Sequence, residues 1–98
     1  MQFSKGRILQ ETLARLPRLK EGEAVLLQPY KKDRSVCIIL RKNQYQVVER
    51  GFDVREFEVE TGKIRKILKS LCRKEFPRSN KIWLKLCSSE EVESYTRK

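Results

Sequence analysis

Apolar residues in the stretch 60–76 recur at intervals of three and four positions, the period of an α-helix. Thr61 is suited to cap this helix, and Pro77 ends the pattern. Lys and Arg occupy most of the remaining positions. We therefore predict a helix with one cationic face and one apolar face that closes the core, the latter formed by Ile64, Ile67, Leu68, Leu71 and Cys72.

Two further stretches have helical character. In the stretch 5–16, Leu and Ile line one side, and Ser4 can cap the helix. Leu16 precedes Pro17, and the residue before a proline is driven out of the α region, so this helix should end there. The segment 88–98 opens with a capping box but holds few apolar residues, which predicts a short C-terminal helix prone to fraying.

Strand-like runs occupy the stretches 24–28, 35–41, 44–50, 53–59 and 81–87. Short turn-forming segments, including Lys42-Asn43, join the first four, which predicts an antiparallel meander. The nearly continuous apolar run 35–41 is typical of a central strand covered on both faces. The last strand follows the cationic helix, so a right-handed crossover should lay it parallel to the fourth strand and near it.

The expected architecture is a single α+β domain over residues 1–98 with element order αββββαβα. Its mixed, mainly antiparallel sheet should carry the two longer helices on one face, in two layers. The opposite face of the sheet should be at least partly open.

Composition narrows the range of functions. At 98 residues the chain can form one core with little room for an enclosed active site. It has no His, which excludes Ser–His–Asp and Cys–His catalysis, and no phosphate-loop or dinucleotide-binding motif. We expect a non-enzymatic protein that needs no cofactor or metal. It has no long apolar run and no signal-peptide pattern at the N-terminus, so we expect a cytoplasmic location without membrane contact.

Charge is the most informative feature. The 23 basic and 13 acidic residues give a formal net charge of +10. Nine of these basic residues and only one acid, Glu75, lie between Thr61 and Lys85, so this stretch supplies +8 of the total (9 − 1). Such a concentration of positive charge attracts polyanions. The phosphate-binding candidates are Lys63, Arg65, Lys66, Lys69, Arg73, Arg78, Lys81 and Lys85. The alternative is a solvated face that only maintains solubility.

Two aromatic residues lie among cations. Tyr30 stands in the loop segment 29–34 beside Lys31, Lys32 and Arg34, which suits stacking on a base and pairing with its phosphate. Strand alternation sends Trp83, with Lys81 and Lys85, to the sheet face away from the helices, where it could stack a base. The alternatives are a Tyr that packs back on the sheet and a Trp that anchors a homodimer or a core layer.

The cysteine and acidic residues are further candidate sites. Cys37, Cys72 and Cys87 are widely spaced, so they are either reduced and mostly buried or form one disulfide and leave one thiol to bridge two copies. The Lys-, Glu- and Arg-rich composition resembles that of thermophile proteins, in which intracellular disulfides occur. A metal-dependent nuclease built on the acidic residues is a minor alternative to simple charge pairing; these residues are Asp53, Glu56, Glu58 and Glu60.

The sequence thus predicts a small basic domain that binds nucleic acid, with RNA or single strands favoured. The competing hypothesis is a protein–protein module that forms a homodimer through Trp83 and the open sheet face, crosslinked by Cys87.

Overall fold

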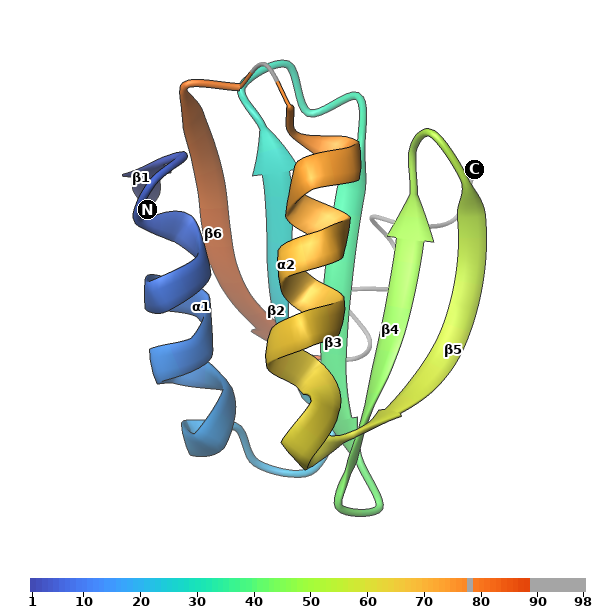
Figure 1. Ribbon diagram of the computed structural model, residues 1–98. Coiled ribbons are helices and arrows are strands. Elements are labelled where there is room, and N and C mark those ends of the chain that lie inside the picture. The colour runs from blue at the N-terminus through green and yellow to red at the C-terminus, as the bar shows by residue number, and fades with distance from the viewer. Residues whose placement is uncertain (78, 89–98) are drawn as a thin grey trace.

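Six strands form one sheet in the order β1-β6-β2-β3-β4-β5 (Figure 1). The computed structural model describes residues 1–77 and 79–88. The strands are β1 (Gln2–Ser4), β2 (Glu23–Pro29), β3 (Ser35–Arg41), β4 (Gln44–Arg50), β5 (Val54–Glu60) and β6 (Lys81–Ser88). The α-helices are α1 (Ile8–Arg15) and α2 (Ile64–Glu75), and the short 3₁₀ turns are η1 (Leu16–Arg18) and η2 (Thr61–Lys63). The predicted α+β class is confirmed.

The meander from β2 to β5 has the predicted antiparallel pairing. The β3–β4 register runs from Ser35↔Arg50 to Arg41↔Gln44, which leaves only Lys42 and Asn43 in the connecting turn. Both turn residues have positive φ, 52° and 64°, as expected for a two-residue hairpin whose twist matches that of its strands. Local turn chemistry therefore sets the register of this part of the sheet.

The predicted position of β6 was wrong. β6 does not join the sheet near β5 but lies between β1 and β2, antiparallel to both. Every pairing among the described strands is antiparallel, so the sheet is not mixed. The physical reason is apolar burial. β2 places its apolar residues between β3 and β6, whereas β5 (VREFEVE) is mostly exposed and suits the edge of a sheet.

The start of the chain also differs from the prediction. Residues Gln2–Ser4 form β1, which pairs with β6 from Gln2↔Trp83 to Ser4↔Lys81. Ser4 therefore ends a strand and does not cap a helix, and α1 begins only at Ile8 without a side-chain cap. The element order of the described part is βαββββαβ. A strand of three residues is too short to show alternation, so no local pattern predicts β1.

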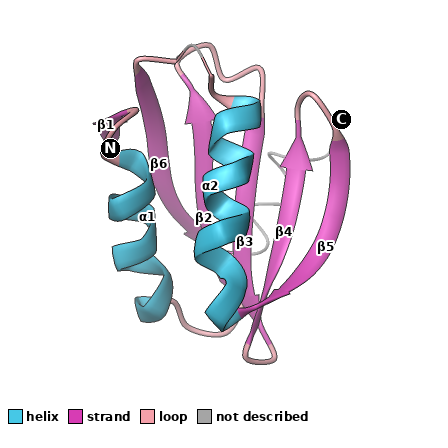
Figure 2. Cartoon of the chain, in the orientation of Figure 1, coloured by secondary structure: helices cyan, strands magenta, loops and turns pink. Residues whose placement is uncertain are grey.

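Both helices lie on the same face of the sheet (Figure 2). Their apolar sides and the inward positions of the strands form the main core, in which Leu68 and Phe76 are fully buried. Val25, Leu27 and Leu84 supply the sheet side of this cluster. None of the helices in the described part of the chain is long and apolar enough to cross a membrane.

The opposite sheet face is less open than the sequence suggested. Alternate positions of the central strands form a second buried cluster there: Ala24, Leu26, Cys37, Ile39, Val48 and Cys87. The near-continuous apolar runs of β2 and β3 explain this, because they direct apolar side chains to both faces of the sheet. The predicted C-terminal helix falls in the segment 89–98 and lies outside the described residues.

Candidate functional site

The outer side of α2 carries a row of exposed cations. Lys63, Arg65, Lys66, Lys69 and Arg73 are all exposed, while Ile64, Leu68 and Leu71 turn into the core. Lys63 lies 3.9 Å from Glu60, and the other four form no ion pair within the described part of the chain. Glu75, the single acid of the basic stretch 61–85, is buried and does not offset this charge at the surface. We call these five residues the α2 cationic face.

A hollow of about 750 Å³ lies at the C-terminal end of α2. The β2–β3 loop, the β4–β5 turn and the end of α2 with the start of β6 lie at this end of the sheet (Figure 1). The volume is within the range typical of small-ligand pockets. Its lining comes from the β2–β3 loop, the β4–β5 turn, the end of α2 and the start of β6, and comprises Pro29, Tyr30, Lys31, Asp33, Arg34, Phe52, Lys74, Glu75, Pro77, Ser79, Asn80 and Lys81. We call this hollow the loop-end cleft.

Two exposed aromatic rings stand in the loop-end cleft. Tyr30 is 73% exposed and Phe52 is 74% exposed. The Arg34 guanidinium lies 5.9 Å from the centroid of the Phe52 ring, within the range of a cation–π contact. Lys31 and Lys81 add further positive charge to the lining. The cleft therefore combines planar apolar surfaces with cations, the two features that bases and phosphates require.

The structure brings together residues that belong to separate candidate sites in the sequence. Tyr30, Lys31, Arg34 and Lys81 share the loop-end cleft, and Arg73 directly precedes Lys74, the first α2 residue of its lining. Phe52 was missed. The one available signal was an aromatic residue between the predicted strands 44–50 and 53–59, where a solvated polar residue is usual. Arg78 lies outside the described residues.

Gly51 permits the close approach of the β4–β5 turn to the end of α2. A Cβ atom at this position would clash with the Glu75 carboxyl group and lie 3.1 Å from the Cβ of Arg34. The Glu75 Oε1 atom instead accepts a hydrogen bond from the Phe52 N–H at 2.9 Å. The turn that presents Phe52 is thus held directly against the last residue of α2.

We expect Gly51→Ala to destabilise the domain by about 1–3 kcal/mol, the usual cost of overpacking a filled site. Gly62→Ala is the matched control, because a Cβ there would meet nothing within 4 Å. Thermal or urea unfolding of the two variants measures the difference. Equal stability of both variants would contradict the close packing of Gly51 against Glu75.

Trp83 and Lys85 do not belong to the loop-end cleft. Their side chains alternate with the core residues Ile82 and Leu84 and so point to the opposite sheet face. The Lys32 ammonium lies 5.1 Å from the centroid of the Trp83 ring, which is itself half-buried. Trp83 therefore already has a cationic partner from the β2–β3 loop, and it is separated from the α2 cationic face by the sheet.

The acids of the β5 region are arranged for charge pairing. Asp53 forms an ion pair with Lys74, and Glu60 with Lys63. Glu56 and Glu58 are exposed on β5. Among residues 1–77 and 79–88, no group of three Cys, Asp or Glu side chains is placed to hold a metal ion. The acids that the structure does bring together are Glu49 and Glu75, which the sequence did not single out.

The three cysteines are free thiols. Cys37 and Cys87 contact each other in the second buried cluster, where their hydrogen bond and burial raise the pKa of the Cys37 thiol. Cys72 packs against the main core, and burial raises its pKa to about 11. Cys37 and Cys72 are thus poor nucleophiles at neutral pH.

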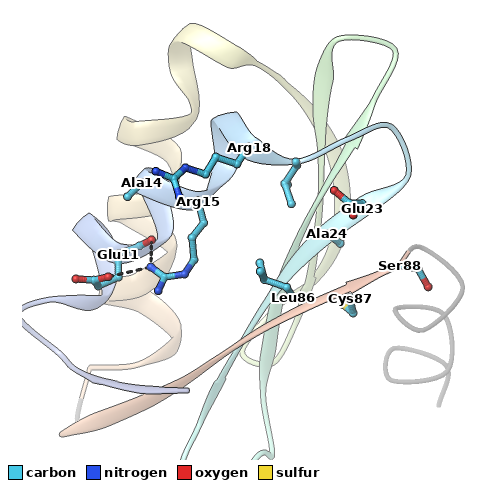
Figure 3. A pocket seen from close by; sticks show the side chains of 10 residues that line it. Glu11, Ala14, Arg15, Arg18, Glu23, Ala24, Leu86, Cys87 and Ser88 are labelled. Atoms are coloured by element: carbon cyan, nitrogen blue, oxygen red, sulfur yellow. Dashed lines mark hydrogen bonds and ion pairs between the residues drawn. The ribbon is translucent and has the colours of Figure 1, made fainter.

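A second hollow, of about 680 Å³, lies between the C-terminal half of α1 and the C-terminal end of β6 (Figure 3). Leu86 points into it and is 52% exposed. Its two arginines are matched by two acids: Arg15 Nη1 lies 2.8 Å from Glu11 Oε1, and Arg18 and Glu23 also line the hollow. This hollow has neither the exposed aromatic rings nor the excess charge of the loop-end cleft.

Comparison of the chain with protein-family models, with curated proteins and with solved structures gives no significant match. Functional inference therefore depends on the geometry and charge of the sites described above.

Proposed function

We propose that this protein is a non-catalytic nucleic-acid-binding domain that takes RNA or other single strands. The observation that carries the proposal is the position of the loop-end cleft, with its exposed Tyr30 and Phe52, at the end of the α2 cationic face. Phosphates along the helix supply affinity, and an unpaired base in the cleft supplies stacking. Binding of this kind requires no catalytic group.

Dimensions support this arrangement. The twelve residues of α2 span about 18 Å at ~1.5 Å per residue. A stacked strand advances about 3.4 Å along its axis for each phosphate, so roughly five phosphates fall within the length of the helix. The α2 cationic face carries five exposed basic side chains over this length. The phosphates of a duplex could also contact these cations. Its bases are paired and stacked on each other, so none is available to stack on Tyr30 or Phe52.

The decisive experiment measures affinity for a labelled single-stranded RNA as a function of salt. With about five phosphate contacts, log K should fall with log[salt] at a slope of about −3.5 (~0.7 per phosphate on a single strand). A matched blunt duplex RNA should bind more weakly than the single strand. The absence of binding at about 0.1 M salt, or binding without a salt slope, would refute the proposal.

The double variant Tyr30→Ala/Phe52→Ala should reduce affinity for single strands by roughly 10- to 100-fold, because each stacked base contributes about 1–3 kcal/mol. Its salt slope should remain that of the wild type, since no charge is altered. The control is Val54→Ala, which removes exposed apolar surface from β5, outside the loop-end cleft. An unchanged affinity of the double variant would remove the cleft from the binding site.

A further inference from the structure

Two carboxyl groups are buried in contact beneath the loop-end cleft. Glu49 on β4 is 0% exposed, and Glu75 at the end of α2 is 1% exposed. Their side chains are within hydrogen-bond distance of each other. Two ionised carboxylates cannot be held together in a buried place, whereas one proton shared between them forms a strong hydrogen bond.

The surrounding charges decide which group keeps the proton. Glu49 has two cationic partners: Arg55 Nε lies 2.9 Å from its Oε1, and Lys74 Nζ lies 3.0 Å from its Oε2. Lys74 also pairs with Asp53. Arg34 approaches Glu75 only through the main chain, its Nη1 donating to the Glu75 carbonyl oxygen at 3.2 Å. The Glu75 carboxyl therefore has no cation of its own among the described residues.

The carboxyl oxygens of Glu75 have different environments. Oε1 accepts a hydrogen bond from the Phe52 N–H, whereas Oε2 is buried without a donor in the described part of the structure. Burial and the neighbouring Glu49 raise the pKa of Glu75, and the Phe52 and Asp53 N–H groups offset only part of that rise. Burial opposes ionisation of Glu49 too, but hydrogen bonds from Glu75, Lys74 and Arg55 lower its pKa overall. Of the two groups, Glu49 is thus the ionised carboxylate, and Glu75 is the one that holds the proton.

We propose that Glu75 is a positioning residue of the loop-end cleft, and that its neutral carboxyl group fixes Phe52 by bridging the Phe52 amide and the Glu49 carboxylate. This inference rests on the proposed function of the cleft. Loss of the proton places a second negative charge against Glu49, and the repulsion drives the Glu75 side chain and the turn at Gly51 apart. Phe52 then loses its fixed position, and single-strand affinity falls as pH rises.

The sign of the effect on stability follows from the same linkage. A group whose pKa is raised by folding contributes stability that is fully present below its unfolded pKa and is lost as pH rises through its folded pKa. For Glu75 this loss begins above the ordinary glutamate value of about 4.3. Glu75→Gln should therefore match the wild type in acid and exceed it in melting temperature at alkaline pH.

The test compares the wild type with Glu75→Gln, whose amide accepts from the Phe52 N–H and donates to Glu49 without titrating. Wild-type affinity for the single-stranded RNA should fall up to about tenfold between about pH 5 and about pH 8. This fold-change corresponds to the low end of the affinity that stacking of one base contributes. The affinity of Glu75→Gln should vary less than about twofold over the same interval, because only the other titratable groups of the protein then change charge. Glu56→Gln removes the same charge from an exposed position of β5 and should keep the wild-type profile.

A second measurement needs no nucleic acid and no variant. The amide resonance of Phe52 in the free wild-type protein should titrate with a midpoint above the ordinary range for Glu. Absence of that titration, or a wild-type affinity profile in Glu75→Gln, overturns the positioning role. If Phe52 titrates while the affinity does not change with pH, the role is equally refuted. Failure of the RNA to bind at all refutes the proposed function, and the Phe52 titration still decides whether Glu75 holds the turn.

Discussion

Leu68→Asp should leave the domain unfolded at room temperature. Leu68 is fully buried on α2, where it packs in the main core against the sheet. Truncating a buried Leu costs about 2–5 kcal/mol, and burying an unpaired carboxylate adds several more. A chain of 98 residues has roughly 5–15 kcal/mol of total stability, so the sum removes most or all of it. Far-UV circular dichroism and a thermal melt provide the measurement.

The matched control is Ser70→Asp. Ser70 is exposed on the same helix, two residues from Leu68, and Asp and Ser have similar helix propensities. This variant should melt within a few degrees of the wild type, as surface substitutions usually change stability by less than about 0.5 kcal/mol. A cooperative wild-type melt for Leu68→Asp would show that α2 does not close the core. A large loss for Ser70→Asp would mean that the outer side of α2 is packed and not free for ligand.

The elements with strong local signals were predictable from the sequence. The apolar period of α2 and the residues Lys42 and Asn43 fixed a helix and a hairpin that the structure contains. Position in the sheet was not predictable in this way, because it depends on which strand edge gains most from a neighbour. β6 pairs with β2 over seven positions, from Glu23↔Ser88 to Pro29↔Ile82, and no local pattern marks that choice.

The candidate site was predictable only in part, for a related reason. The charge of α2 is visible along the sequence, as is the cluster of Tyr30 with Lys31 and Arg34. The cleft itself depends on the β2–β3 loop, the β4–β5 turn and the connection from α2 to β6 meeting at one end of the sheet, and Phe52 joins it only through that tertiary arrangement. Glu49 and Glu75 are 26 positions apart (75 − 49) and acquire meaning only when β4 and α2 are packed together.

Reversing the charge at two positions of the α2 cationic face, Lys66→Glu and Lys69→Glu, should weaken single-strand binding by roughly 30- to 100-fold at about 0.1 M salt. Each change removes one attraction to phosphate and introduces one repulsion, and an exposed pair contributes up to about 1 kcal/mol. The two reversals together therefore cost about 2–3 kcal/mol, and about 1.4 kcal/mol corresponds to tenfold in affinity. Because phosphates carry no sequence information, RNA strands of every sequence should weaken equally.

The salt dependence separates this effect from a general loss of positive charge. Losing two phosphate contacts should reduce the magnitude of the salt slope by about 1.4, at ~0.7 per contact. Arg18→Glu/Lys20→Glu changes the net charge by the same amount at two exposed positions after α1, of which Arg18 lines the hollow of Figure 3. That control should retain nearly the wild-type affinity and slope, because steering by net charge is screened beyond about 10 Å. Equal losses in both variants would mean that the whole surface attracts RNA without a defined path along α2, and an unchanged affinity for the α2 variant would exclude this face from the interface.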